Sequence, residues 1–255
     1  MRRQFRHTYT TRYDESDYTG SLTPAAFVRY LQDIAMLDAE DARLEGDNYW
    51  VARRTVLSFA APVQMHTLLE LTTYGIGFTR ITAQRGYEAR IAGEESSEPV
   101  ISARTLWVYV DGRGRPARLP ERINQIWLPD GPSPQHAEAP WPPFPQSVPD
   151  VVPYTVRYSD TDRMKHMNNA AYVEVLDDAA WEAYREANIA ADEALLEVLD
   201  YDIDYGESAR LGEELTIETW FDPQPSAGKE FTRLQHMKRG ETTLVRARSR
   251  WVWRA

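Results

Sequence analysis

The sequence contains no cysteine among its 255 residues. Disulfide bonds, cysteine nucleophiles and thiolate metal sites are therefore excluded. It also has no apolar run that approaches the length of a membrane span. The start of the chain, Met1–His7, has the basic charge of a signal peptide but no apolar segment behind it, so we expect a cytoplasmic location.

The chain also lacks an excess of positive charge, because 29 Lys and Arg residues stand against 39 Asp and Glu residues and the net charge is −10. This balance argues against general nucleic-acid binding. A local basic patch can still meet an acidic partner. The candidates are an arginine cluster around a Gly-rich turn (Arg113, Arg115, Arg118 and Arg122), which is otherwise a solvated hairpin tip, and a cation pair farther on (Arg163 and Lys165).

Hydrophobic residues make up 42% of the chain and include eight Trp and fourteen Tyr, which is typical of a soluble globular protein of one or two domains. In the first half, alternation predicts a strand over 5–13. Thr23 as N-cap and Pro24 as the first helical residue predict the start of an amphipathic helix. Strand-like runs follow over about 53–63, 68–75, 78–91 and 100–111.

The same order of strand, helix and strands occurs again in the second half. Residues 13–28 align with 158–173 without a gap, at an offset of 158 − 13 = 145, which places Asp17 on Asp162. Later landmarks extend the match: residues 78–81 resemble 231–234, and 103–109 resemble 247–253. The common order favours an internal duplication over a chance resemblance of two α+β halves.

A proline-rich segment joins the two halves. We expect an N-terminal domain over 1–119, a linker over 120–153 and a C-terminal domain over 154–255. The eight prolines between 129 and 149 disfavour regular helix or central strand, and aromatic residues at 127, 141 and 144 suggest an extended strap packed along the body. A helix followed by an antiparallel sheet predicts an α+β unit in which the sheet wraps around one buried helix.

The strongest candidates for catalytic residues lie in a polar loop, 159–169, between the strand over 154–158 and the helix that starts near Ala170. Apolar residues recur at helical spacing from Tyr172 to Ala187, and Asn168 and Asn169 occupy the N-cap region. A helix N-terminus offers unpaired N–H groups and partial positive charge, which can stabilise a carbonyl oxygen that gains negative charge. Asp162 and His166 flank that place. The alternative is a capped amphipathic helix after a polar turn.

Comparison of the two halves locates the chemistry in the second one. Where the second half has His166, the first has Ser21. The polar run 201–210 corresponds to an apolar run, 58–63, in the first half. We therefore expect acid-base chemistry in the C-terminal half, and either an oily ligand or an ordinary hydrophobic core in the N-terminal half.

The run 159–172, with its Asp-x-x-x-His-x-Asn-Asn pattern, resembles the active-site motif of plant and bacterial acyl–acyl-carrier-protein (acyl-ACP) thioesterases, which are double-hotdog enzymes. The resemblance covers nearly the whole chain, including Ser21–Ala35, 50–54 and 107–111 of the first half. Single-hotdog acyl-CoA thioesterases share the bare pattern. Fused halves with the motif only in the second favour the acyl-ACP branch.

The resemblance implies a hydrolase of fatty acid biosynthesis that cleaves fatty acyl-ACP into free fatty acid and carrier protein. It makes Asp162 and His166 catalytic, together with Glu207, which matches an acidic residue on the following strand of the family. Asp162 attacks the carbonyl or positions a water, His166 orients the thioester or relays a proton, and Glu207 is the candidate base. Substrate-positioning roles fall to four further residues: Met164, Asn168, Asn169 and Ser208.

Two of these positions depart from the family pattern. The family usually has Asn where this chain has Met164, and Met cannot donate the hydrogen bonds of an amide. Many plant members have Cys where this chain has Ser208, whose hydroxyl can orient Glu207 or a water.

We expect no cofactor and no metal, because His166 has no second histidine at ligand spacing. The expected partner is acyl carrier protein, without nucleic acid or membrane span, and a homodimer is a further expectation. Two alternatives stay open at this point: an acyl-CoA thioesterase, and a hotdog protein that binds acyl chains without cleaving them.

Overall fold

The computed structural model describes residues 2–44, 48–94, 98–186 and 195–254. By its internal contacts the chain forms two compact units. Unit 1 comprises Met1–Leu22 and Arg29–Trp141, and unit 2 comprises Thr23–Val28 and Pro142–Ala255. Within the described ranges, no helix combines the length and apolar character that crossing a membrane requires.

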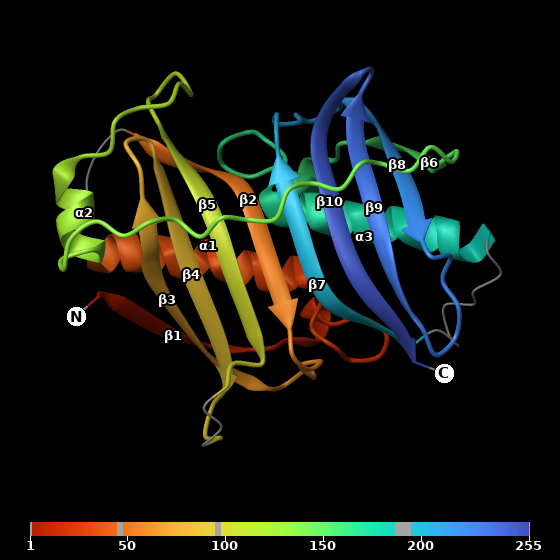
Figure 1. Ribbon diagram of the computed structural model, residues 1–255, viewed down its shortest axis with the longest axis horizontal. Helices are drawn as coiled ribbons and strands as arrows, with labels where there is room; N and C mark the ends of the chain where they lie inside the picture. The colour runs from red at the N-terminus through yellow and green to blue at the C-terminus, as the bar shows by residue number, and fades with distance from the viewer. Residues whose placement is uncertain (1, 45–47, 95–97, 187–194, 255) are drawn as a thin grey trace. The chain divides into compact units, whose positions relative to one another are not determined.

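Unit 1 contains five antiparallel strands in the order β1-β3-β4-β5-β2. The long helix α1 (Pro24–Asp41) runs behind them in the view of Figure 1. A short helix, α2 (Glu121–Trp127), follows β5 along the chain. The strands are β1 (Gln4–Thr10), β2 (Tyr49–Phe59), β3 (Leu68–Phe78), β4 (Thr82–Ile91) and β5 (Ile101–Val110).

Unit 2 repeats this plan with the strand order β7-β10-β9-β8-β6 and one long helix, α3 (Asn169–Glu186). Read from the edge strand inward, β6, β8, β9, β10 and β7 stand where β1, β3, β4, β5 and β2 stand in unit 1. The predicted double hotdog, two α+β units each with a sheet around a helix, is therefore confirmed. The strands are β6 (Asp150–Thr155), β7 (Leu195–Tyr205), β8 (Glu214–Asp222), β9 (Glu230–Arg239) and β10 (Thr242–Arg254).

The offset of 145 holds through the first third of each copy. It relates the two 3₁₀ turns, Tyr13–Glu15 and Tyr158–Asp160, and the two 18-residue helices. The sequence match of 78–81 with 231–234 is wrong, however. Gln235 pairs with Ala247 and Tyr87 pairs with Ala103, so β4 and β9 correspond at an offset of 235 − 87 = 148 and Arg85 is the counterpart of Arg233.

Both helices begin where the capping residues predict. The Thr23 Oγ1 accepts a hydrogen bond from the Ala26 N–H at 3.2 Å, and the Asn168 Oδ1 accepts one from the Ala170 N–H at 2.9 Å. The inner face of α1 is fully buried at Phe27, and the buried face of α3 includes Tyr172. The last position of the predicted apolar face, Ala187, lies outside the described residues.

The segment between the copies differs in part from the expected linker. It contains α2, which lies before the first of the clustered prolines, and β6 begins at Asp150 rather than after 153. Pro153 fits inside β6 because β6 is an edge strand that pairs only with β8 within unit 2. The domain limits themselves stay a prediction.

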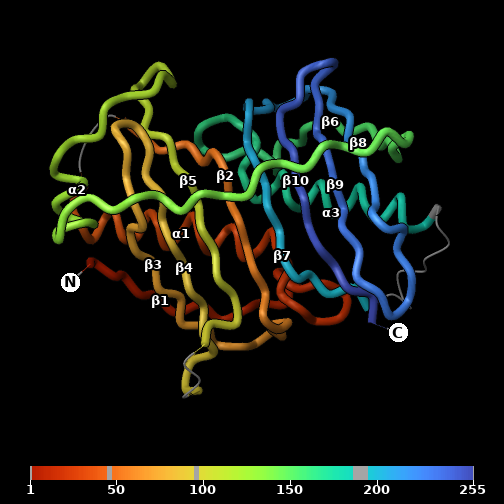
Figure 2. Tube along the Cα trace, viewed as in Figure 1, coloured from red at the N-terminus to blue at the C-terminus, as the bar shows by residue number. Residues whose placement is uncertain are grey.

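The expected strap is present between these elements. Figure 2 shows residues 134–141 crossing the sheet of unit 1 on the face opposite α1. There the Gln84 side chain hydrogen-bonds the backbone N–H and C=O of His136, and Glu138 pairs with Arg104 at 2.8 Å. Gly77 permits this contact, because a Cβ at that position would lie 2.4 Å from the Pro134 carbonyl oxygen. In unit 2, Phe144 stacks on His236 of β9.

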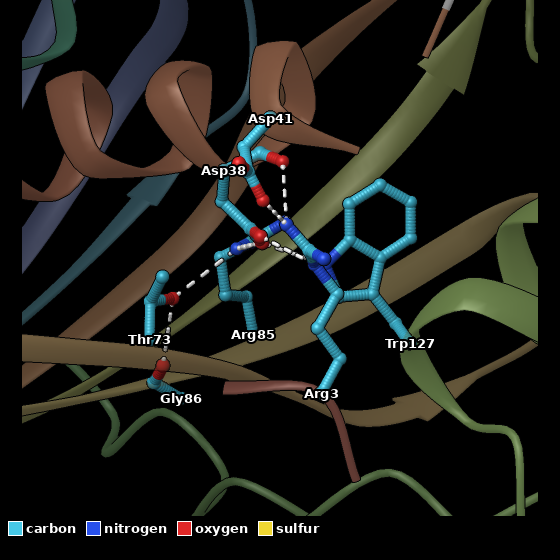
Figure 3. Close-up of polar contacts among 7 residues, drawn as sticks. All are labelled: Arg3, Asp38, Asp41, Thr73, Arg85, Gly86 and Trp127. Carbon is cyan, nitrogen blue, oxygen red and sulfur yellow. Dashed lines mark hydrogen bonds and ion pairs between the residues drawn. The ribbon is translucent and has the colours of Figure 1, made fainter. Parts of the chain in front are cut away.

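A buried charged network closes the C-terminal end of α1 in unit 1 (Figure 3). The Asp38 carboxylate accepts hydrogen bonds from Arg3 Nε at 2.8 Å, from an Arg85 terminal nitrogen at 2.5 Å and from Trp127 Nε1 at 2.6 Å. The side chain of Asp38 is 1% exposed, whereas Asp41, which also pairs with Arg3, is 57% exposed. Asp38 thereby ties α1 to three other segments.

We predict that Asp38→Asn destabilises the protein by roughly 3 kcal/mol, because it removes the buried carboxylate that pairs with the largely buried Arg85 and with Arg3. Thermal unfolding of the purified variant measures the effect. Asp41→Asn is the matched control, and its loss of an exposed ion pair should change stability by less than about 1 kcal/mol. Similar melting temperatures for the two variants would contradict the role assigned to Asp38.

Candidate active site

The loop that carries Asp162 and His166 is built on a buried carboxylate. Asp160 ends the second 3₁₀ turn, and its Oδ2 accepts hydrogen bonds from the Tyr154 hydroxyl and the Arg157 N–H, both at 2.6 Å. Its carbonyl oxygen accepts the N–H of Asn168 at 2.8 Å. Asp160 therefore fixes both ends of the loop, which leaves the side chains between them to vary without loss of backbone geometry.

Asp162 and His166 lie at the two ends of one tight turn. The Asp162 N–H donates to the His166 carbonyl oxygen at 3.0 Å, and the Asp162 Oδ1 accepts the Met164 N–H at 2.8 Å. Both side chains are partly exposed, so substrate or water can reach them. The structure thus brings together the two residues that the motif predicts as catalytic.

The equivalent turn of unit 1 has the same backbone and a different use of its carboxylate. The Asp17 N–H donates to the Ser21 carbonyl oxygen at 2.8 Å. The Asp17 Oδ1 accepts three hydrogen bonds, from the Thr19 N–H, the Thr19 hydroxyl and the Ser21 N–H. In unit 2, Met164 stands at the position of Thr19, and among the described residues its N–H is the one hydrogen-bond donor to the Asp162 carboxylate. Asp162 therefore keeps acceptor capacity that Asp17 has lost.

The start of α3 follows this turn directly. The Asn168 side chain caps the helix by accepting a hydrogen bond from the Ala170 N–H. The backbone carbonyl oxygen of Asn168 accepts the Tyr172 N–H at 3.3 Å. The Asn169 carbonyl oxygen accepts the hydroxyl of Tyr205 at 3.2 Å. The two predicted substrate-positioning asparagines thus hold the helix N-terminus in place, where partial positive charge gathers.

Glu207 and Ser208 lie on the segment after β7, not on the strand, because β7 ends at Tyr205. Both residues are exposed. The Glu207 carboxylate pairs with Arg239 at 2.9 Å, and the same guanidinium pairs with Glu213 at 2.9 Å. This segment adjoins the loop 160–168, since the Met167 N–H donates to the Ala209 carbonyl oxygen at 2.8 Å. The role of Glu207 as the base for water stays a prediction.

Two tyrosines at this site were missed by the sequence reasoning. The Tyr172 hydroxyl accepts the Ala209 N–H at 2.7 Å, and the Tyr205 hydroxyl donates to Asn169. Burial raises the pKa of Tyr172 to about 12, and the negative charges of Glu213 and Asp162 act in the same direction. The signal was available, because Phe27 and Phe59 stand at the equivalent positions of the first copy and each lacks the hydroxyl.

Among the described residues, no group of three or more His, Asp or Glu side chains is arranged to hold a metal ion. Met164, predicted to position substrate, is 42% exposed in the turn between Asp162 and His166.

Two family models match the chain. Residues 2–126 match the acyl-ACP thioesterase N-terminal domain, and residues 156–253 match the thioesterase-like superfamily. Together they leave only the segment 127–155 and the extreme ends unmatched. The boundary between the two matches falls within the proline-rich segment that separates the two copies.

Solved structures resemble the chain over almost its whole length. They include an oleoyl thioesterase (putative) from Lactobacillus plantarum, with a TM-score of 0.84 at 15% identity over 99% of this chain and 96% of that one. A 12:0-ACP thioesterase from Umbellularia californica has a TM-score of 0.79 at 17% identity over 98% and 94%. An acyl-ACP thioesterase from Bacteroides thetaiotaomicron has a TM-score of 0.74 at 18% identity over 97% of each chain.

At these identities the structural likeness establishes the fold, and no curated protein matches the sequence. The family models carry the identification further, because the N-terminal match is specific to acyl-ACP thioesterases and the C-terminal match covers the half that holds Asp162 and His166. The chain belongs to the acyl-ACP thioesterase family and is a thioester hydrolase acting on acyl-ACP.

Proposed function

We propose that the hydrolysis takes place at the turn 162–166 of unit 2 and releases free fatty acid in fatty acid biosynthesis. The observation that carries this proposal is the contrast between the two copies of one turn. The copy in unit 1 has no histidine and its Asp17 Oδ1 accepts three hydrogen bonds, whereas the copy in unit 2 has His166 and, among the described residues, its Asp162 Oδ1 accepts one, from the Met164 N–H.

The thioester carbonyl oxygen is proposed to lie at the N-terminus of α3. The Ala170 N–H is taken by Asn168, and among the described residues no acceptor bonds the next amide, that of Ala171. This amide and the helix dipole supply donors for an oxyanion. The two tyrosine hydroxyls keep the helix start and the neighbouring segment in register while charge develops.

Asp162 then acts on the carbonyl carbon, either as the nucleophile or through a water that it orients. In the first route the thiolate of the pantetheine arm leaves, and water hydrolyses the resulting anhydride. In the second route water adds directly. His166 supplies the proton that the leaving thiolate takes up, and Glu207, oriented by Arg239 and with Ser208 beside it, is the proposed base for water. Met164 and the asparagines position the substrate.

The acyl chain is proposed to bind in the N-terminal half, along the apolar face of α1 that includes Phe27, Val28 and Leu31. These residues are almost completely buried. In unit 1 the Arg85–Asp38 ion pair lies far along α1. In unit 2 the buried pair Arg233–Asp177 instead lies mid-helix, with the Arg233 guanidinium over the rings of Tyr201 and Trp251. A buried ion pair there disfavours an oily chain under α3.

Acyl carrier protein is the partner that the family implies. A cytoplasmic location, a homodimer and the absence of a cofactor belong to the same proposal. Size-exclusion chromatography with light scattering tests the homodimer.

The test of the function is an assay on carrier protein charged with acyl chains of eight to eighteen carbons, beside the matching coenzyme A thioesters. Higher kcat/KM on the carrier-bound series supports the proposal. Faster turnover of the coenzyme A series would favour the acyl-CoA alternative, and binding without turnover would favour a non-catalytic acyl-binding protein.

We predict that Asp162→Ala and His166→Ala each lower kcat by at least about 100-fold, because each removes a group that acts on the reacting carbonyl or the leaving sulfur. The melting temperatures should change little, since both side chains are partly exposed and make few hydrogen bonds. Steady-state kinetics and thermal unfolding measure the two effects.

Asp17→Ala is the matched control for Asp162→Ala. It should retain activity but lower the melting temperature, because Asp17 accepts three hydrogen bonds that stabilise its turn. Equal loss of activity from the two alanine variants would contradict an active site confined to unit 2.

A separate prediction concerns chain length. Leu31→Ala should shift the preference toward longer acyl chains by several-fold per added methylene, because each methylene buried in an apolar site contributes about 0.8 kcal/mol. The product profile on the mixed carrier-bound series measures the shift.

Leu176→Ala is the control for that shift, since Leu176 is the buried counterpart of Leu31 at the offset of 145. It creates a similar cavity in unit 2 and should lower stability without changing the profile. A profile that moves with Leu176→Ala and not with Leu31→Ala would place the acyl chain in the C-terminal half.

A further inference from the structure

Three exposed cations surround the proposed catalytic turn. Arg163 and Lys165 lie within the turn, and Arg210 follows Ala209, whose carbonyl oxygen bonds the N–H of Met167. Among the described residues none of the three cations forms an ion pair with a carboxylate. We call Arg163, Lys165 and Arg210 the catalytic rim.

The carboxylates of this region have partners other than the side chains of the rim. Glu207 and Glu213 both pair with Arg239, and the Glu213 carboxylate also accepts the backbone N–H of Arg210 at 3.2 Å. Asp160 accepts the Tyr154 hydroxyl and the Arg157 N–H. The rim therefore presents positive charge on a chain whose net charge is −10.

Unit 1 supplies an internal comparison, because its loop has the same backbone hydrogen bonds. The Leu22 N–H bonds the Val63 carbonyl oxygen as the Met167 N–H bonds that of Ala209, so Arg210 corresponds to Gln64 at an offset of 209 − 63 = 146. The counterparts of Arg163 and Lys165 are Tyr18 and Gly20 at the offset of 145. All three rim positions are uncharged in the copy without the catalytic pair.

Lys165 has a left-handed backbone conformation, which lysine rarely adopts. Its φ is +62°, and its counterpart Gly20 has a φ of +81°. The turn thus needs a left-handed backbone at this position, a conformation that glycine adopts freely and lysine adopts only with strain. A residue that is strained in one copy and replaced by glycine in the other points to a function for the lysine side chain.

We propose that the catalytic rim is the docking surface for the acidic face of the acyl carrier protein. This inference rests on the proposed function and specifies where the carrier binds. A partner that delivers a thioester on a flexible arm must approach close to Asp162, and positive charge beside that carboxylate steers an acidic partner to the correct edge. Met164 and Leu211, both exposed beside the rim, add apolar contact.

The other arginine cluster of the sequence fits this role less well. Arg115 pairs with Asp111 at 3.0 Å, and Arg122 donates to the carbonyl oxygen of Arg43 at 3.3 Å. The cluster also belongs to unit 1, which holds none of the proposed catalytic residues. Arg113 and Arg118 serve instead as a matched control for charge reversal.

The first experiment compares R163E/K165E/R210E with R113E/R118E at low salt. Each protein is assayed on acyl-ACP, on acyl-phosphopantetheine and on an acyl-N-acetylcysteamine thioester of the same chain length. The rim variant should raise KM for acyl-ACP roughly tenfold or more beyond any change on the N-acetylcysteamine thioester. Added salt should reduce the difference in KM for acyl-ACP between the rim variant and the parent enzyme, because screening raises the KM of the parent enzyme. The control variant should behave as the parent enzyme.

Lys165→Gly tests the same proposal without charge reversal. It gives the turn the residue that unit 1 has, so the melting temperature should stay equal or rise. The KM for acyl-ACP should still increase by a few-fold, since one steering charge is gone. A stable Lys165→Gly enzyme with unchanged carrier kinetics would overturn the role of Lys165.

The remaining outcomes separate the inference from the function on which it rests. An equal rise in KM for acyl-ACP and acyl-phosphopantetheine would show that the rim binds the phosphate of the arm, and it would overturn docking of the carrier surface. An effect of R113E/R118E alone would move the docking surface to unit 1. Failure of the parent enzyme to hydrolyse acyl-ACP, with turnover of coenzyme A thioesters, would refute the function itself.

Discussion

The structure depends on a backbone hydrogen bond that occurs once in each copy and closes the tight turn before the long helix. It joins the Asp17 N–H to the Ser21 carbonyl oxygen in unit 1 and the Asp162 N–H to the His166 carbonyl oxygen in unit 2. The bond uses no side-chain atoms, so it survives substitution around it. Each turn leads through a capping residue into its helix, and one carboxylate is therefore held close to each helix N-terminus.

The position of buried charge separates the two copies more than their folds do. Arg85 and Arg233 occupy equivalent places on β4 and β9, and each pairs with an aspartate of the helix in its own unit. The partner is Asp38 near the end of α1 but Asp177 in the middle of α3. Because a buried ion pair needs its partners close and water absent, its position decides how much of each helix face stays apolar.

Much of the fold and of the candidate site was predictable from the sequence, because the spacing of apolar residues, the helix-capping residues and the ungapped repeat are local signals. The repeat gave both helices, and the motif gave the Asp162–His166 turn. The β4–β9 register was not predictable, since two strands with different hairpin lengths align by cross-strand pairing that a short sequence match does not report. Helix α2 was not predicted, because the contacts of Trp127 join residues that are distant in sequence: its ring is buried in a cluster with Tyr109, and its Nε1 donates to Asp38.

Two tyrosine hydroxyls distinguish the surroundings of the proposed catalytic turn from those of its counterpart in the first copy. Where the first copy has Phe27 and Phe59, the second has Tyr172 and Tyr205, and both hydroxyls bond backbone atoms beside the turn. In unit 1 the carboxylate of Asp17 itself stabilises the turn through three accepted bonds. A carboxylate that takes part in a reaction must keep its lone pairs for substrate or water, so other groups have to stabilise its surroundings. The two tyrosines meet that need, and Met164, which has no hydroxyl to donate to Asp162, is consistent with it.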